Sequence, residues 1–149
     1  MAVAARAPLL LLAVVAAALT LAPATTAHTR PTAREAALVE AINEARAAYG
    51  LRPVALGPGI ADRARAYARS LIERNVFVHG RLRPGTGEVL AWGTPGLMGA
   101  RAVVQRWLAS PEHRVILLWP RARRVGVGLA VGRFQGYAGV RVVVARLSV

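Results

Sequence analysis

The stretch VGVGLAVGRFQGYAGVRVVVA, residues 125–145, decides the fold class, because its hydrophobic pattern changes from a helical period to that of strands. Val125, Val127 and Leu129 alternate with small residues, and glycines gather between positions 132 and 139. A second apolar run then begins at Val140. Period-two alternation on both sides of a glycine-rich turn predicts a β-hairpin.

Two amphipathic helices are predicted upstream of the hairpin. The capping-box pattern TARE, residues 32–35, is followed by Leu38 and Ile42 at helical spacing until Gly50 ends the run. After a loop rich in proline and glycine, residues 60–75 repeat alanines and leucine on one face. Both helices can therefore cover one side of a sheet.

The middle of the chain is predicted to be a loop followed by a third helix. Glycine and proline dominate from residue 76 to 99, and the hydrophobic periodicity disappears there, so we expect a connection that carries polar side chains. A third helix is expected over residues 98–109. Its inward-facing residues are predicted to be Ala102, Val103, Arg106 and Trp107.

A short fourth helix should follow directly. Ser110 is a suitable N-cap and Pro111 suits the first helical position, so Glu112 and His113 are expected on this helix. Helices that come first and strands that come last, joined by a short antiparallel connection, favour an α+β fold over a doubly wound parallel one.

The N-terminal 27 residues have the pattern of a secretory signal peptide. Arg6 precedes an apolar run from Leu9 to Leu19, and small residues follow, so we expect cleavage after Ala24 or Ala27. A retained membrane anchor is the alternative, but the run is shorter than the ~20 residues that a spanning helix needs. Residues 28–149 should then form one exported domain, which we expect to be a monomer. We expect it to be secreted or to lie at the exterior of the cell envelope.

Composition excludes several enzyme classes. The chain contains neither cysteine nor lysine, which removes cysteine nucleophiles, Schiff-base lysines, Ser-Lys dyads and Walker-type phosphate loops. A triad of Ser110, His113 and Asp62 can be written, but the serine lacks a nucleophile-elbow context. An exported domain without cysteine must also be stable without disulfides, which favours a bacterial envelope protein.

The formal net charge of +13 suggests an anionic partner. All 20 basic residues are arginine, however, and such a one-sided choice is equally typical of GC-rich codon usage. We therefore expect non-specific affinity for polyanions such as phospholipid or wall polymer, and no specific nucleic-acid recognition.

Five short motifs, taken in order, resemble the signature blocks of bacterial CAP domains, the cysteine-rich secretory, antigen 5 and pathogenesis-related (SCP-like) proteins. They are AINEAR (residues 41–46) with YGL (49–51), FVH (77–79), GE (87–88), WLASPEHR (107–114) and VGVG (125–128). The resemblance implies an αβα sandwich, in which a small antiparallel sheet lies between helical layers beside a polar cleft. Its two histidines and one acidic residue match His79, His113 and Glu88.

Imidazole nitrogens and a carboxylate are suitable ligands for a divalent metal such as zinc, so His79, Glu88 and His113 are the predicted metal or ligand-binding residues. A polar pocket without a metal is the alternative, with the histidines as partly buried hydrogen-bonding residues. Two departures from the family pattern concern this cleft. Val89 stands where relatives have asparagine, and only eight residues, 80–87, separate His79 from Glu88. Whether Glu112 belongs to the cleft stays open at this point.

These observations favour an exported binding module whose ligand is a metal, a lipid or an envelope polymer. The first alternative is a metal-dependent hydrolase or peptidase that uses Glu88 as base with the two histidines. The second is a purely electrostatic binder of anionic envelope polymers. No nucleophile or water-activating pair can be assigned, so binding is favoured over catalysis, and no catalytic residue is predicted.

Overall fold

The computed structural model describes residues 28–149, so the predicted signal peptide lies outside the described residues. The helices and strands, in order, are α1 (Ala33–Ala48), β1 (Ala55–Leu56), α2 (Pro58–Arg74), β2 (Thr86–Gly93), the 3-10 turn η1 (Pro95–Leu97), α3 (Ala100–Ala109), α4 (Pro111–Leu117), β3 (Arg124–Phe134) and β4 (Tyr137–Ser148). Among the described residues, no helix combines the length and apolar character needed to cross a membrane.

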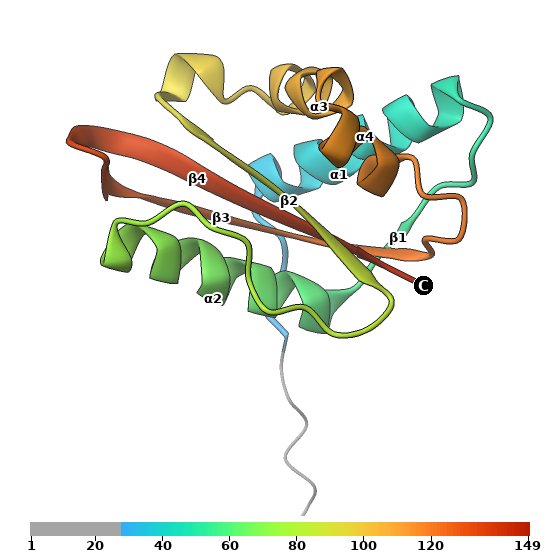
Figure 1. Ribbon diagram of the computed structural model, residues 1–149, viewed down its shortest axis with the longest axis horizontal. Helices are drawn as coiled ribbons and strands as arrows, with labels where there is room; N and C mark the ends of the chain where they lie inside the picture. Colours follow the sequence, from blue (N-terminus) through green and yellow to red (C-terminus); the bar gives the residue numbers. More distant parts are fainter. Residues whose placement is uncertain (1–27) are drawn as a thin grey trace, which may run out of the picture.

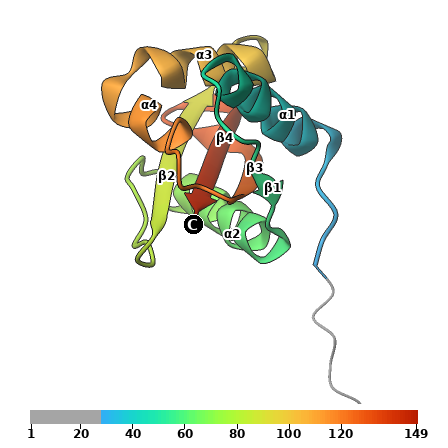
Figure 2. The same cartoon turned by 90° about the vertical axis from the view of Figure 1, so that its right-hand side faces the viewer.

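A four-stranded sheet in the order β1-β3-β4-β2 lies between two helical layers. Helix α2 covers one face, and α1, α3 and α4 lie over the other (Figures 1 and 2). This arrangement confirms the α+β class and the layered architecture. The sheet is mixed, because the short β1 pairs in parallel with β3 while the other pairs are antiparallel.

The predicted hairpin is present, with a tighter turn than the sequence indicated. Strand β3 continues to Phe134 and β4 begins at Tyr137, so only Gln135 and Gly136 form the turn. Both have positive φ, 50° and 85°, as a two-residue turn of type I′ requires. Because β4 is central and has helices over both faces, Val142, Val143 and Val144 are all fully buried.

The alternation of valine and glycine in β3 is explained by its contact with α2. A Cβ atom added at Gly128 would lie 2.1 Å from the backbone nitrogen of Arg65, and one at Gly126 would lie 2.3 Å from that of Ala61. The strand and helix backbones therefore touch directly, which is possible only where the strand has no side chain. The valines between the glycines point to the opposite face, into the core beneath α1 and α3.

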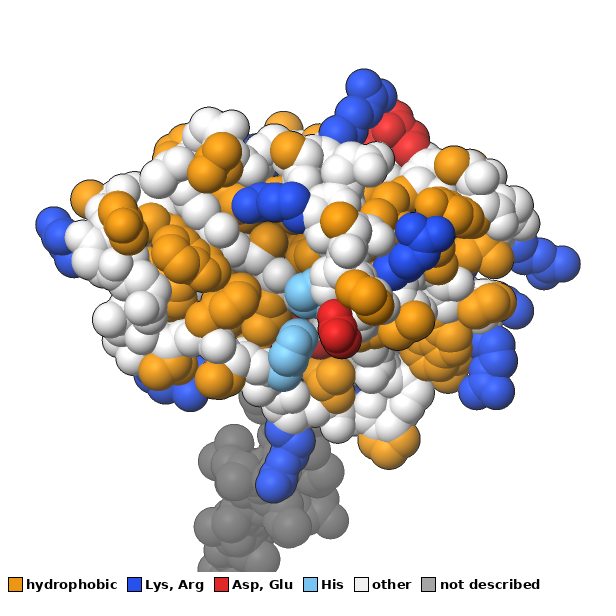
Figure 3. Space-filling model, turned by 45° about the horizontal axis from the view of Figure 1, so that its top comes forward, with side chains coloured by type: hydrophobic (Ala, Val, Ile, Leu, Met, Phe, Trp, Pro, Cys, Tyr) orange, Lys and Arg blue, Asp and Glu red, His pale blue; other side chains and the backbone are white. Residues whose placement is uncertain are grey.

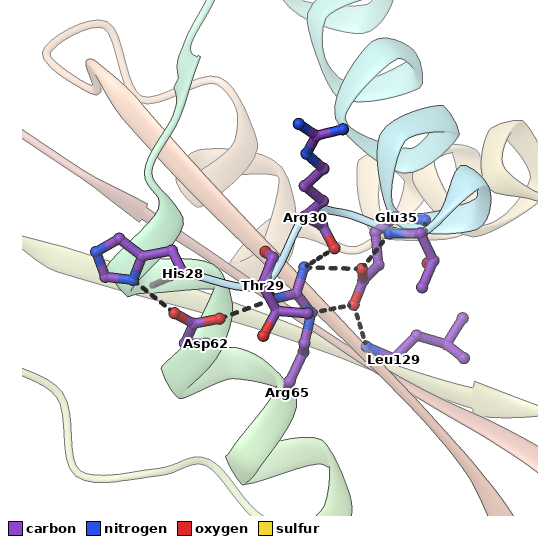
Figure 4. Close-up of polar contacts among 8 residues, drawn as sticks. His28, Thr29, Arg30, Glu35, Asp62, Arg65 and Leu129 are labelled. Carbon is purple, nitrogen blue, oxygen red and sulfur yellow. Dashed lines mark hydrogen bonds and ion pairs between the residues drawn. The ribbon is translucent and has the colours of Figure 1, made fainter. Parts of the chain in front are cut away.

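A buried ion pair ties α1 to α2 (Figure 4). Glu35 accepts two hydrogen bonds from Arg65, at 2.8 and 2.9 Å, and a third, at 3.3 Å, from the backbone N–H of Leu129 on β3. The same Glu35 completes the predicted capping box with Thr32. Arg65 also bonds Asp62 at 2.8 Å, and Asp62 in turn bonds His28 at 2.7 Å. One carboxylate thus connects α1, α2 and the central sheet.

The prediction that residues 76–99 form a loop is wrong for their second half. Thr86–Gly93 forms β2, which pairs with β4 over its whole length. Two glycines and an alanine give this segment weak intrinsic strand preference, and Val89 and Leu90 are both buried because both faces are covered. The segment therefore lacks the alternation by which a half-exposed strand is recognised.

The predicted inward face of the third helix needs a partial correction. Val103 and Trp107 are buried as expected, but the third buried residue of α3 is Val104. Ala102 and Arg106 are exposed. The helix begins at Ala100, after η1 and the N-cap Gly99, and its buried stripe packs into the core cluster beneath α1.

Candidate functional site

His79 and Glu88 are in direct contact at the edge of the sheet. His79 lies in the segment between α2 and β2, whereas Glu88 is on β2 and has only 1% of its surface exposed. The Nδ1 atom of His79 is 3.0 Å from Glu88 Oε1, and the same oxygen accepts the backbone N–H of Gly80 at 2.9 Å. A buried carboxylate therefore fixes both the imidazole and the backbone that carries it.

Arg146 provides the charge that balances Glu88. It lies directly opposite Glu88 in the register of β2 and β4, and its Nε donates to Glu88 Oε2 at 2.8 Å. Its guanidinium carbon also lies 4.9 Å from the ring centroid of Tyr67 on α2. The Tyr67 hydroxyl donates to the carbonyl of Val78 at 2.8 Å, so α2 also holds the segment that carries His79.

His113 reaches the same place from α4. The imidazole centroids of His113 and His79 are 6.4 Å apart, and their planes are inclined by 52°. Figure 3 shows two histidine side chains side by side on this face, next to an acidic side chain and flanked by apolar ones. Burial and the nearby His79 lower the pKa of His113 from its usual 6.5, and Glu112 opposes this shift. Near neutral pH, His113 therefore has a free ring nitrogen.

Glu112 lies beside this pair on the exposed side of α4. Its Oε2 accepts a hydrogen bond from the Ser110 hydroxyl at 2.9 Å, so Ser110 begins the helix without capping it through its side chain. The backbone N–H of Glu112 and the Ser110 hydroxyl lower the pKa of this carboxyl group, with a smaller contribution from His113. Glu112 is therefore ionised at neutral pH within electrostatic reach of His113.

The structure brings the three predicted metal ligands near one another but does not leave all of them available to a metal. His79 contacts Glu88, and His113 lies beside His79, but both Glu88 oxygens are occupied by hydrogen bonds. Within residues 28–149, no three His, Asp or Glu side chains form a group that could hold a metal ion by themselves. Of the three predicted ligands, the two histidines therefore have ring nitrogens available to a ligand.

The triad written from Ser110, His113 and Asp62 is not assembled. Asp62 lies on α2, where it pairs with His28 and Arg65, while the Ser110 hydroxyl is bonded to Glu112. Helix α2 packs on the face of the sheet opposite α4 (Figure 1). The sheet itself therefore separates the aspartate from the other two residues.

A sequence model of the CAP family, described as the cysteine-rich secretory protein family, matches residues 39–145 of this chain. The chain is a member of the CAP family. The match spans all five motifs, from within α1 to within β4. No curated protein sequence matches the chain.

Several solved CAP structures share the fold. An outer surface protein of Borrelia burgdorferi superposes with a TM-score of 0.62 at 22% identity, covering 74% of this chain and 88% of that one. An extracellular SCP-domain protein of Bacillus anthracis gives 0.62 at 20% identity, covering 77% of this chain but 40% of that protein. NaASP2, solved with Zn²⁺, gives 0.59 at 14% identity, covering 76% of this chain and 78% of that one. At these identities the likeness establishes a common fold.

Two residues of this CAP site were not found from the sequence. Arg146 interrupts the apolar run of β4, and a charged residue in a strand that is otherwise buried is a usable signal for a buried ion pair. The ring of Tyr67 on α2 stacks on Arg146, and its hydroxyl bonds the loop that carries His79. Neither role can be recognised without knowing that β4, α2 and the loop are neighbours.

Proposed function

We propose that this CAP domain is an exported binding module whose cleft binds a divalent metal ion such as zinc through His79 and His113. The observation that carries the proposal is the adjacency of the two imidazoles, with ring centroids 6.4 Å apart. NaASP2, which has the same fold, was solved with Zn²⁺. Water or a carboxylate from a ligand would complete the tetrahedral coordination that zinc prefers.

The contacts of His79 support a ligand role. A carboxylate paired with Arg146 only accepts hydrogen bonds, so the proton of the neutral imidazole lies on Nδ1 and the lone pair on Nε2. A buried carboxylate that orients a histidine in this way is the usual outer partner of a metal ligand. We therefore assign Glu88 a positioning role and the two histidines the ligand role.

The same contacts argue against the hydrolase alternative. A general base must reach a water or a substrate proton with a free oxygen, whereas Glu88 is buried and bonded through both oxygens. Glu112 is exposed, but it lies outside the His79 and Glu88 contact. A binding function is therefore favoured over metal-dependent hydrolysis.

Zinc titration by calorimetry on three forms of the exported protein tests the proposal. Wild type should take up one zinc at neutral pH, and His113→Ala should lose this uptake. His28→Ala is the matched control, because His28 bonds Asp62 on α2, away from the cleft, and this variant should bind as wild type does. Zinc affinity should fall below about pH 6, where the imidazoles become protonated.

Two results would overturn the metal proposal. Wild type that takes up no zinc at neutral pH would leave the cleft as a plain polar pocket. Equal uptake by wild type and His113→Ala would place the zinc elsewhere on the protein. Circular dichroism on each variant verifies that the fold is intact, which is expected because His113 is only partly buried.

Export is the second part of the proposal. It rests on the predicted signal peptide and on relatives such as the extracellular Bacillus protein. Intact mass measured on protein recovered outside the cytoplasm should correspond to a chain that begins at residue 25 or 28. A recovered chain that still begins at Met1 would contradict cleavage.

A further inference from the structure

We propose that the domain carries a second binding site, an arginine pocket that takes the phosphate group of a small soluble phosphate monoester. The arginine pocket is a cavity of about 260 Å³ beside α2, and its polar lining consists of Arg63, Arg81, Arg83, Arg146, Thr86 and Ser148. Its side chains come from α2, the loop before β2, and the facing ends of β2 and β4. Its polar side chains are arginines and hydroxyl residues, and no Asp or Glu is among the lining residues.

The buried Arg146 is the strongest sign that the pocket receives a ligand. Only 9% of the residue is exposed, and its single hydrogen bond within residues 28–149 runs from Nε to Glu88. The terminal amino groups of its guanidinium have no protein acceptor among these residues, and Arg146 lines both this pocket and an adjoining cavity next to Gly80. Arginine donors that reach a cavity and have no protein acceptor there can bond an anion.

Three further guanidinium groups face the same space without partners. Arg63, Arg81 and Arg83 form no ion pair and donate no side-chain hydrogen bond to any residue from 28 to 149. Glu88 pairs with Arg146, and Asp62, which precedes Arg63 in the chain, pairs with His28 and Arg65. The pocket therefore keeps a concentrated positive charge, which attracts a ligand with two negative charges more strongly than one with a single charge.

The chemistry of the donors points to phosphate. The planar guanidinium fork donates two parallel hydrogen bonds to a phosphate group, and several arginines around one cavity can bond several of its oxygens at once. The hydroxyls of Thr86 and Ser148 provide further donors, while Ile60 and Leu82 give the wall a small apolar part. A short organic group attached to the phosphate fits against this apolar part.

Calorimetry and NMR titration with glycerol 3-phosphate test the site on the purified exported protein. Wild type should bind it saturably at one site, and Arg81→Gln with Arg83→Gln should weaken binding at least about tenfold, because charge-assisted hydrogen bonds are lost. The matched control is Arg52→Gln with Arg121→Gln. It removes the same charge from two exposed arginines that line neither cavity, and should change affinity less than about twofold.

Three further comparisons distinguish a specific phosphate site from general charge attraction, from membrane binding and from the zinc site. Equal weakening in both double variants would overturn the proposal in favour of general charge attraction, as would wild type that does not saturate. Vesicles of phosphatidylglycerol that bind while glycerol 3-phosphate does not would overturn it in favour of a membrane surface. His113→Ala should keep full phosphate binding and the Arg81, Arg83 variant should keep zinc uptake, so failure at one site is distinguishable from failure at the other.

Discussion

Glu35 on α1 and Arg65 on α2 form a buried, two-pronged ion pair, with Nε to Oε1 at 2.8 Å and Nη2 to Oε2 at 2.9 Å. Glu35 is 2% exposed and Arg65 is 8% exposed. Arg65 also lies where the backbone of α2 touches Gly128 of β3. This pair therefore fixes how the two helical layers are placed on the central sheet.

Glu35→Gln should destabilise the domain by up to about 3–5 kcal/mol, because the buried charge of Arg65 then keeps only the partly exposed Asp62 as its partner. Urea unfolding at neutral pH measures the change. Glu40→Gln on the same helix is the control, since Glu40 is exposed, and it should stay within about 0.5 kcal/mol of wild type. Equal stability of Glu35→Gln and wild type would show that the pair does not hold the layers together.

The pH dependence of stability should carry the signature of Glu35. Burial alone would raise the pKa of this carboxyl group, but the hydrogen bonds and charge of Arg65, with the bonds of Thr32, lower it below the usual 4.5. A carboxyl group whose pKa is lowered by folding stabilises fully above 4.5, and this stabilisation is lost as the pH falls below that value. Below pH 4.5, the free energy of unfolding should therefore fall less steeply with decreasing pH in Glu35→Gln than in wild type.

Gly128→Ala should destabilise the domain by about 3 kcal/mol or more, because the new methyl group would collide with the backbone of Arg65 and α2 would have to move. Gly96→Ala is the control, since a Cβ at Gly96 meets nothing within 4 Å. Thermal unfolding compares the two variants. A melting temperature of Gly128→Ala close to that of Gly96→Ala would contradict the direct contact of strand and helix.

Trp107→Ala should cost about 3–5 kcal/mol, as expected for a large aromatic side chain that is only 2% exposed. Trp107→Phe keeps most of the apolar volume but loses the hydrogen bond from Nε1 to the carbonyl of Leu90, at 2.8 Å, and should cost about 1–3 kcal/mol. Chemical denaturation measures the free energy of unfolding of wild type and of the two variants. If the alanine variant were as stable as the phenylalanine variant, packing by Trp107 would contribute nothing.

His113 should titrate below its usual pKa of 6.5, with burial as the larger cause and the neighbouring His79 as the smaller one. In His79→Asn the midpoint of His113, followed by NMR of the ring protons, should rise but stay below 6.5. A base whose pKa is lowered by folding stabilises fully above 6.5, and this contribution is lost as the pH falls below that value. An unchanged midpoint in His79→Asn would show that the two imidazoles do not interact.

Much of the fold follows from local patterns in the sequence. The capping box before α1, the alternation of β3 and the proline at the start of α4 each lie within a few consecutive residues, so their physical causes are readable without the rest of the chain. Motif order also indicated the family, which the match over residues 39–145 confirms. The shared ligand site of His79, Glu88 and His113 stays a prediction, although the rings of the two histidines lie 6.4 Å apart between centroids.

Strand β2 was decided only by the tertiary structure. Its residues have weak strand preference, and its hydrogen bonds come from β4, whose paired residues lie 48 to 62 positions later in the chain. Glu88 was consequently expected on a loop, whereas the sheet buries it. A strand whose two faces are both covered loses the alternation on which sequence prediction depends.

The charged contacts likewise needed the fold. Glu35 meets Arg65 across 30 positions and Glu88 meets Arg146 across 58, and nothing in the intervening sequence sets these pairings. Any of the 20 arginines was a possible partner by composition alone. Folding selects one for each carboxylate, because a buried charge is stable only where the packed elements bring an opposite charge to hydrogen-bonding distance.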